Sequence, residues 1–318
     1  MEIETDLIQK YGGQAPRYTS YPPANHFTAV PDLAERIQAQ LAQPGAATGP
    51  FSLYLHFPYC SELCFFCGCN MEITHSPEKA SSYIQHLLAE IDLWCSLGAT
   101  PLNAIEIHFG GGSPSDITPA SMDRILMKLR ESFHLMPNLQ LSLEVDPRHV
   151  KDEAQVKKWV EQGFNRISLG VQDFDVNVQK AVNRIQPEYQ TIQTLEWFRR
   201  HGVASINIDL IYGLPLQCPT SFARTLKKVL ALSPDRMALF QFAYLPKLKK
   251  HHRMLTEADL PSASVRLQLF NLALATLTDN GYVYLGMDHF ARANDPLALA
   301  AREKRMGRNF QGYHDGLA

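Results

Sequence analysis

Short apolar runs alternate with longer amphipathic stretches along most of this chain. Six runs rich in β-branched and aromatic residues predict β-strands, and they cover residues 51–57, 104–109, 140–145, 166–170, 205–211 and 237–242. Between and after these runs, apolar positions recur at helical spacing. They predict α-helices near residues 77–97, 119–133, 152–162, 189–201, 219–232 and 262–280. Strand and helix therefore alternate six times.

Residues typical of helix ends support several of these boundaries. Ser76 and Pro77 fit a serine N-cap followed by proline at the first helical position. Gly163, Gly202 and Gly281 each follow a predicted helix. Glycine is common there because it adopts the left-handed backbone conformation that ends a helix.

The alternation predicts an α/β fold whose strands are parallel and joined by right-handed crossovers. A closed barrel needs eight such units, so we predict a partial (β/α)6 TIM-like barrel with an N-terminal extension. A doubly wound sheet is the alternative, but no G-x-G-x-x-G turn follows the first strand. In both architectures ligands bind where the strands end, which makes the residues after each strand the candidates for chemistry.

The residues before the first strand differ in composition from the rest of the chain. Residues 14–49 hold several Pro, Ser, Thr and Ala, with one helical pattern near residues 32–41. We expect three parts: an N-terminal extension at residues 1–50, a barrel core at 51–245 and a C-terminal extension at 246–318.

Composition narrows the class of protein. The chain has 318 residues, of which 45% are hydrophobic, and this is ample for a buried core. Its formal net charge of −2 gives no global sign of binding to nucleic acid or to a membrane surface. We see no secretion signal and no apolar run of the roughly 20 residues that cross a bilayer. We therefore expect a cytoplasmic protein.

The cysteines carry the sharpest chemical signal. Four of the six fall within ten residues after the first strand, spaced C-x3-C-x2-C-x-C. Disulfides are not expected in a reducing compartment. Zinc sites usually use two separated C-x2-C pairs, so this compact loop favours an iron–sulfur cube, which three thiolates can hold with one iron left open. The four are Cys60, Cys64, Cys67 and Cys69.

The two remaining cysteines, Cys95 and Cys218, stand alone in the sequence. A free cysteine usually behaves as a small apolar side chain. We expect both to be packing residues.

The C-x3-C-x2-C loop after the first strand resembles that of the radical S-adenosylmethionine (SAM) superfamily. The sequence C-G-C-N resembles its oxygen-independent coproporphyrinogen III oxidase branch. The resemblance implies a [4Fe–4S] cluster on Cys60, Cys64 and Cys67, with Cys69 as a neighbour that does not ligate. It also implies that SAM binds the open iron and is cleaved to a 5′-deoxyadenosyl radical.

Motifs at the ends of later strands continue the resemblance, and it implies roles for individual residues. Tyr54 and His56 would be catalytic, with Tyr54 also contacting the first SAM molecule. The glycine-rich H-F-G-G-G-S-P segment and the L-E-V-D-P-R segment would help to bind that molecule, and later motifs would bind a second one. The cofactor-binding residues implied are Tyr54, Phe66, Gly111, Gly112, Ser113, Glu144, Gln172, Arg184, Asp209 and Ala243.

The residues alone leave plainer interpretations open. Tyr54 and His56 could be packed core aromatics, and the glycine triplet could simply form a turn. Glu144 could cap a helix or form a surface ion pair. Asp209 lies in an apolar run, where a bare carboxylate costs several kcal/mol, so an ion pair with Arg184 is the plain alternative to ligand binding.

The resemblance runs from the A-P-R-Y-T-S-Y-P segment near residue 15 to N-F-Q-G-Y near residue 310. Family members continue well past this second signature into a domain that covers the substrate. We therefore expect a truncated gene product, a split protein or a fragment, with a complete cluster loop and an incomplete substrate cavity. Arg17 and the basic loop from Lys247 to Arg253 are candidates to bind substrate carboxylates.

The function that the resemblance implies is the oxidative decarboxylation of coproporphyrinogen III to protoporphyrinogen IX without oxygen. Another radical reaction on a tetrapyrrole, such as a methyl transfer, is an alternative. So are a haem-binding chaperone and an inactive truncated product. The C-G-C-N cysteine and the P-R-Y-T-S-Y-P segment favour the oxidase over the chaperone. We expect a monomer that receives electrons from flavodoxin or ferredoxin and binds neither nucleic acid nor membrane.

Overall fold

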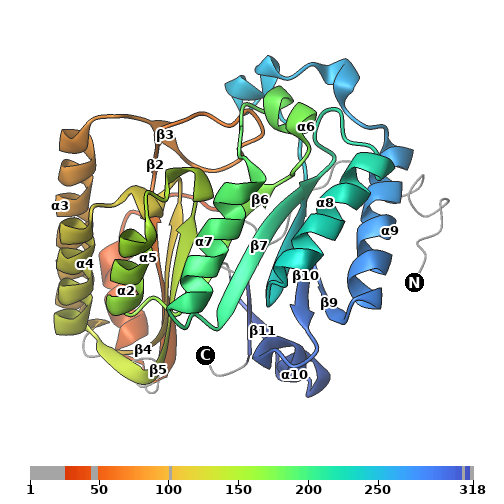
Figure 1. Cartoon of the computed structure of the whole chain (residues 1–318). Coiled ribbons are helices and arrows are strands. Elements are labelled where there is room, and N and C mark those ends of the chain that lie inside the picture. The colour runs from red at the N-terminus through yellow and green to blue at the C-terminus, as the bar shows by residue number, and fades with distance from the viewer. Residues whose placement is uncertain (1–25, 44–48, 100–101, 310–311, 316–318) are drawn as a thin grey trace.

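The computed structural model describes residues 26–43, 49–99, 102–309 and 312–315. Within these residues, six parallel strands lie side by side in chain order and form one curved sheet (Figure 1). They are β1 (Pro50–Phe57), β4 (Asn103–Gly111), β5 (His134–Val145), β6 (Arg166–Gln172), β7 (Ser205–Tyr212) and β8 (Arg236–Gln241).

The predicted partial (β/α)6 barrel is thus confirmed. The sheet continues beyond β8 with the antiparallel strands β10 (His289–Arg292) and β9 (Tyr282–Gly286), which the sequence pattern did not reveal. Two short strand pairings complete the strands of the described residues. They involve β2 (Tyr59–Cys60) with β3 (Glu72–Ile73), and β11 (Gly307–Arg308) with β12 (Tyr313–His314).

The helices pack along the outer face of this sheet (Figure 1). Each long crossover helix begins and ends within a few residues of its predicted position. The helices are α2 (Leu33–Leu41), α3 (Pro77–Trp94), α4 (Pro119–Ser132), α5 (Glu153–Glu161), α6 (Val176–Ala181), α7 (Glu188–Arg200), α8 (Pro219–Leu232), α9 (Ala263–Asp279) and α10 (Pro296–Arg302). No helix of the described residues is long and apolar enough to cross a membrane.

The cap residues behave as their chemistry predicts. The Ser76 hydroxyl accepts a hydrogen bond from the Lys79 N–H and Pro77 opens α3. Gly163, Gly202 and Gly281 have φ angles of 106°, 87° and 85°, the left-handed conformation that ends a helix.

The two faces of the barrel strands differ in polarity. On β7, Ile206, Ile208 and Leu210 are fully buried against the helices. The alternating residues Asn207 and Asp209 face the inside of the barrel and line a cavity there. Successive side chains of a strand point to opposite faces. The apolar face therefore packs against the surrounding helices to form the core, and the polar face lines the interior of the barrel.

Candidate active site

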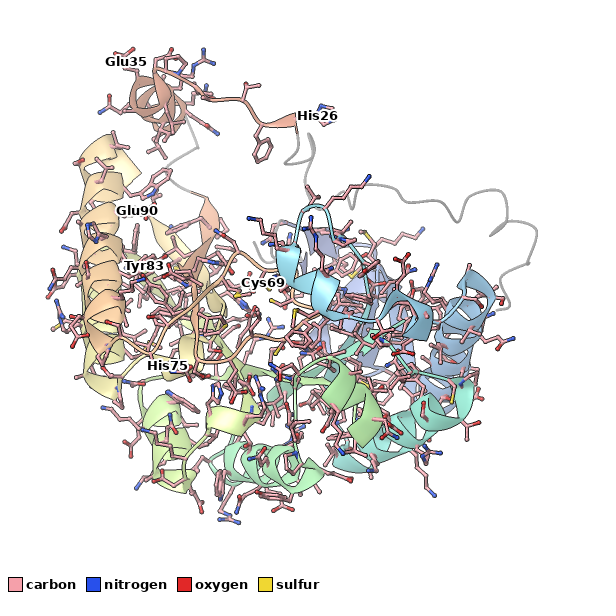
Figure 2. All side chains as sticks on the ribbon, turned by 90° about the horizontal axis from the view of Figure 1, so that it is seen from above. His26, Glu35, Cys69, His75, Tyr83 and Glu90 are labelled. Atoms are coloured by element: carbon pink, nitrogen blue, oxygen red, sulfur yellow. The ribbon has the colours of Figure 1, made fainter. Side chains whose placement is uncertain are left out.

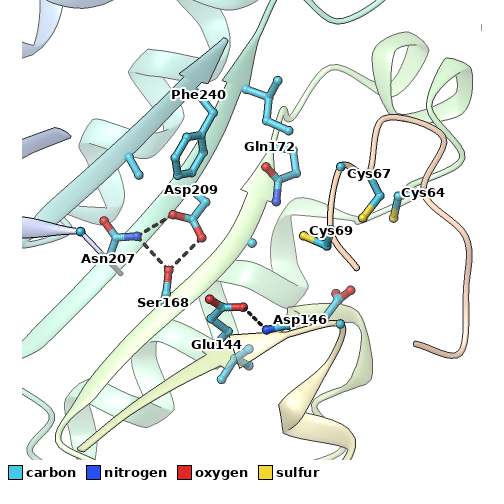
Figure 3. Close-up of a pocket in the computed structure, with 18 of the residues that line it drawn as sticks. Cys64, Cys67, Cys69, Glu144, Asp146, Ser168, Gln172, Asn207, Asp209 and Phe240 are labelled. Atoms are coloured by element: carbon cyan, nitrogen blue, oxygen red, sulfur yellow. Dashed lines mark hydrogen bonds between the residues drawn. The ribbon is translucent and has the colours of Figure 1, made fainter. Parts of the chain in front are cut away.

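A cavity of about 710 Å³ lies inside the barrel, between the cysteine loop and the inward faces of β4 to β8. Figure 3 shows Cys64, Cys67 and Cys69 on one side of it, with Glu144, Gln172 and Asp209 projecting from the strands. The cavity brings together most of the residues predicted from the sequence. They are Cys60, Cys64, Phe66, Cys67, Gly111, Gly112, Ser113, Glu144, Gln172, Arg184, Asp209 and Ala243.

The cysteine loop is fixed to the end of β4 by the glycine triplet. The N–H of Gly112 donates to the Phe57 carbonyl oxygen at 2.7 Å, and the N–H of Ser113 donates to the Tyr59 carbonyl oxygen at 2.8 Å. A Cβ atom on Gly112 would lie 2.6 Å from the same Tyr59 oxygen and 2.9 Å from the Cys60 sulfur. These glycines therefore allow the end of β4 to approach the cysteine loop closely. Their N–H groups largely donate to acceptors within the protein.

Two arginines approach the Cys64 sulfur. Arg184 Nη1 lies 3.6 Å and Arg148 Nη2 3.7 Å from Cys64 Sγ. The same two side chains pair with Asp146, at 2.9 Å and 2.7 Å. Burial alone would raise the pKa of the Asp146 carboxyl, but the charges of Arg184 and Arg148 outweigh it and hold this pKa well below its usual range. Positive charge is thereby concentrated beside a predicted cluster ligand.

The Arg184 pairing contradicts the plain alternative for Asp209, an ion pair between these two residues. The structure does not pair Arg184 with Asp209. Asp209 instead accepts hydrogen bonds from the Ser168 hydroxyl at 2.8 Å and from the Asn207 amide at 2.7 Å. Burial, together with the nearby charge of Glu144, raises the pKa of Asp209 to about 6 despite these bonds. The carboxyl therefore has neutral partners and faces the cavity.

Tyr54 and His56 lie behind the cavity wall. The Tyr54 hydroxyl lies 3.0 Å from His56 Nδ1, and His56 Nε2 lies 2.8 Å from the Asn70 carbonyl oxygen. The Tyr54 ring stacks on His108, whose Nε2 is 3.0 Å from a Glu144 oxygen. Burial would lower the pKa of His108, but its hydrogen bond to Glu144 and the charge of that carboxylate raise it. Tyr54, His56 and His108 therefore link the cysteine loop to the Glu144 carboxylate on β5.

The expected substrate cations are placed differently from the prediction. Of the basic loop, only Lys249 and His252 line the cavity, and the Lys249 ammonium already donates to the Cys69 carbonyl oxygen at 2.8 Å. Lys247, Lys250 and Arg253 are exposed and do not line it. Arg17 lies outside the described residues.

One of the two isolated cysteines also differs from expectation. Cys95 packs partly against the core, as predicted. Cys218 is exposed and precedes α8, where its thiol contacts the Ser221 hydroxyl at 3.5 Å. It is the N-cap residue of α8 rather than a core position.

The described side chains fit an iron–sulfur cluster better than a single metal ion. Among the described residues, no three His, Cys, Asp or Glu side chains converge as the ligands of one ion would. The four loop cysteines nevertheless line one cavity, and a four-iron cube is large enough to bind ligands spread along a loop. Arg184 lines the cavity, and its Nε is buried without a hydrogen-bond partner among the described residues.

The model of the radical SAM superfamily matches residues 54–229. The oxygen-independent coproporphyrinogen III oxidase of Salmonella typhimurium is 45% identical over 314 residues, which is 98% of this chain and 68% of that protein. The Escherichia coli K12 enzyme of the same name is 44% identical, with the same coverage. This chain belongs to the oxygen-independent coproporphyrinogen III oxidase family.

A solved structure agrees with this assignment. Coproporphyrinogen III oxidase HemN from Escherichia coli, described as a radical SAM enzyme, superposes with a TM-score of 0.90 at 41% identity, covering 99% of this chain and 70% of that one. As a family member, the chain is a radical SAM oxidoreductase. Membership implies a [4Fe–4S] cluster and SAM as its cofactors.

Several residues of the site were not predicted individually from the sequence. Asp146, Arg148, His108, Ser168 and Asn207 all line the cavity. A usable signal was present for four of them. His108, Asp146, Ser168 and Asn207 each lie two residues from, or on the neighbouring strand to, a predicted site residue on the same face of the sheet. Arg148 lies in the short 3-10 helix after β5 and carried no such signal. Reading every second residue of each strand would have found most of them.

Proposed function

We propose that this chain catalyses the oxygen-independent oxidative decarboxylation of coproporphyrinogen III to protoporphyrinogen IX. The observation that supports this most is that one cavity is lined by the four cysteines of the loop and by Glu144 and Asp209. When bound, the cluster and SAM supply an electron and a 5′-deoxyadenosyl radical. At each of two substrate propionates, a hydrogen atom would leave the β-carbon, CO2 would be lost, one electron would pass to an acceptor and a vinyl group would remain.

In this proposal the cysteine loop holds the cluster. Cys60, Cys64 and Cys67 would be the ligands, and Cys69 would be a neighbour that does not ligate. A thiol binds metal as its thiolate. The two guanidinium groups beside Cys64 would offset the negative charge that a cluster with thiolate ligands carries.

The carboxylates and Arg184 would bind two SAM molecules. Each SAM carries an ammonium group, a carboxylate and ribose hydroxyls. Glu144 would accept hydrogen bonds from the first molecule, and Asp209 from the second. The buried, unpartnered Nε of Arg184 would donate to a carboxylate. Phe66, Gln172 and Ala243 line the same space and would complete the second site.

Tyr54 and His56 would act from behind this wall. Their mutual hydrogen bond, and the stacking of Tyr54 on His108, would fix His108 against Glu144. The two residues would thus hold a SAM-binding carboxylate in place rather than exchange protons with the substrate.

The wider setting is also part of the proposal. The unpaired thiols of the loop persist in a reducing compartment, so we place the chain in the cytoplasm, working as a monomer. Flavodoxin or ferredoxin would deliver its electrons, and neither nucleic acid nor membrane would be a partner. The barrel core at residues 51–245 would carry the cofactors, flanked by the two extensions.

The test is an anaerobic assay of the chain after reconstitution with iron and sulfide. The chain is reduced and given SAM and coproporphyrinogen III, and deoxyadenosine and protoporphyrinogen IX are measured together. Formation of both products is expected. Deoxyadenosine without protoporphyrinogen would reject the proposed substrate, and haem binding without either product would favour the chaperone alternative.

A further inference from the structure

The loop that follows β8 lies directly over the cysteine loop. We call residues 247–253 the basic loop. The Lys249 ammonium donates to the Cys69 carbonyl oxygen at 2.8 Å, and His251 Nε2 lies 2.7 Å from the Cys67 carbonyl oxygen. Figure 2 looks down on this end of the molecule and shows Cys69 beside the pale cyan ribbon of this region. The basic loop thus touches the backbone of a predicted cluster ligand.

A small apolar cluster anchors this arrangement. Phe242 and Leu255, on either side of the basic loop, are buried with Val178 and Val182 of the α6 region, and Phe65 of the cysteine loop packs against them. Within the loop, the His252 Nδ1 accepts a hydrogen bond from the Leu245 N–H. Packing of this kind keeps a loop in one position, so the basic loop is a fixed platform beside the cysteine loop.

The outer side of the platform carries unneutralised positive charge. Lys247, Lys250 and Arg253 are exposed, and none forms an ion pair within the described residues. The sequence holds no Asp or Glu between Asp235 and Glu257. Since the whole chain has a formal net charge of −2, this concentration of cations is a local feature.

Two large apolar side chains stand among these cations. Leu248 is 78% exposed and Met254 is 65% exposed. Water-exposed apolar side chains ringed by charged groups are typical of surfaces that bind another protein. Because the three exposed cations do not line the cavity, their partner approaches from solution rather than from the barrel interior.

We propose that the basic loop is the docking surface for an acidic one-electron carrier protein that reduces the cluster. This rests on the proposed function, because a cluster that cleaves SAM needs an electron from outside. Complementary charge speeds encounter between proteins by about 10- to 1000-fold. Electron-transfer complexes are small and transient, so a platform of this size suffices. A carrier seated there lies against the segment that contacts Cys67 and Cys69.

The test reverses the charge of the platform with Lys247→Glu, Lys250→Glu and Arg253→Glu in one variant. A matched control carries Arg124→Glu, Lys227→Glu and Lys304→Glu. Those three cations are also exposed and without an ion pair among the described residues, and they lie on α4, on α8 and after α10. Each reconstituted protein is reduced either by flavodoxin with its reductase and NADPH, or by dithionite. Bleaching of the cluster absorbance and deoxyadenosine formation are followed at equal cluster content.

The platform variant should lose roughly tenfold or more of the flavodoxin-driven rate, as expected for electrostatic steering, and keep the dithionite-driven rate. Added salt should slow flavodoxin reduction of the unchanged protein but not of the platform variant. Unchanged flavodoxin-driven reduction, or an equal loss in the control, would overturn the proposal.

A second variant guards against a folding defect. If the glutamates impair cluster assembly, the change of all three residues to glutamine removes the charge without reversing it. It should still slow flavodoxin-driven reduction, and no slowing would reject the docking surface. The readouts do not require a porphyrinogen. If dithionite yields deoxyadenosine but no protoporphyrinogen, the proposed function fails while the docking result stands.

Discussion

The surroundings of the Asp209 carboxyl group leave it able to bind a ligand. It lies on the cavity face of β7, held by Ser168 and Asn207 rather than by a cation. An ionised carboxylate in such a place is less stable than in water, and its pKa rises to about 6 for that reason. A bound ammonium or ribose hydroxyl group would stabilise the ionised carboxylate. Asp209 is therefore well placed to bind a ligand.

The raised pKa of Asp209 predicts a pH dependence of stability in the cluster-free chain. The folded state binds this proton more tightly than the unfolded state, whose pKa is near the ordinary 3.8. The carboxyl should therefore stabilise the fold increasingly as the pH falls from about 6 towards 4, and this contribution should be lost as the pH rises through 6.

Asp209→Asn removes this titration. The free energy of unfolding of the unchanged chain, relative to the variant, should rise by about 1–3 kcal/mol between pH 7.5 and pH 4. Urea unfolding of both proteins at several pH values measures it. A difference that does not vary with pH would contradict the raised pKa.

Arg148 allows a comparison between a buried and an exposed ion pair of the same side chain. Its buried partner is Asp146 at 2.7 Å and its exposed partner is Glu62 at 2.6 Å. Arg148→Met leaves Asp146 with Arg184 alone and should destabilise the fold by about 1–3 kcal/mol. Glu62→Gln should change stability by no more than about 0.5 kcal/mol. Denaturant unfolding measures both. Equal effects would show that the buried carboxylate does not depend on Arg148.

At the scale of elements, the strands carry the site through their alternation. β5, β6 and β7 turn apolar side chains to the helices and polar ones to the cavity. Their apolar faces made these strands predictable from sequence. The same period placed Glu144 and Asp209 on cavity faces, but it could not show which polar side chains pair across strands. For that reason the Asp146 pairing of Arg184 was missed.

The hairpin of β9 and β10 shows what sequence patterns miss. Its strands are short, and its turn is formed by Met287 and Asp288, both with positive φ. Glycine and asparagine usually mark such turns, and neither occupies these two positions. The sheet continues through this hairpin because β10 pairs with β8, a long-range contact that local periodicity cannot reveal.

The contacts around Gly112 and Gly170 predict that alanine at these two positions affects cluster assembly very differently. In Gly112→Ala the new methyl would meet backbone at 2.6 Å, whereas in Gly170→Ala it would meet only the flexible ends of Arg184 and Gln172, at 3.1 Å. The backbone at Tyr59 cannot move away from the new methyl group unless the cysteine loop moves with it. Gly112→Ala should therefore lose at least about half of its iron after reconstitution, and Gly170→Ala should lose little.

Iron and sulfide content per chain, measured with circular dichroism as a check on folding, tests this pair. If folded Gly112→Ala binds iron as well as the unchanged protein, the close contact is not required for cluster assembly. A similar loss in both variants would point to a general disturbance of the cavity.

At the scale of the whole molecule, the fold separates stability from chemistry. The apolar core lies between the sheet and its helices, while the cavity inside the barrel is polar and meets the cysteine loop at one end. Fold class and cluster loop were predictable because both depend on local patterns. The position of the basic loop could not be predicted, because Lys249 contacts Cys69, which is 180 residues away in the sequence.

The most direct test of the account uses coproporphyrinogen III deuterated at the β-carbons of its propionates. The reconstituted, reduced chain is given this substrate and SAM under anaerobic conditions, and the deoxyadenosine is analysed by mass spectrometry. We predict deoxyadenosine that carries deuterium, formed together with protoporphyrinogen IX. Deoxyadenosine without deuterium, released while the substrate stays intact, would contradict it.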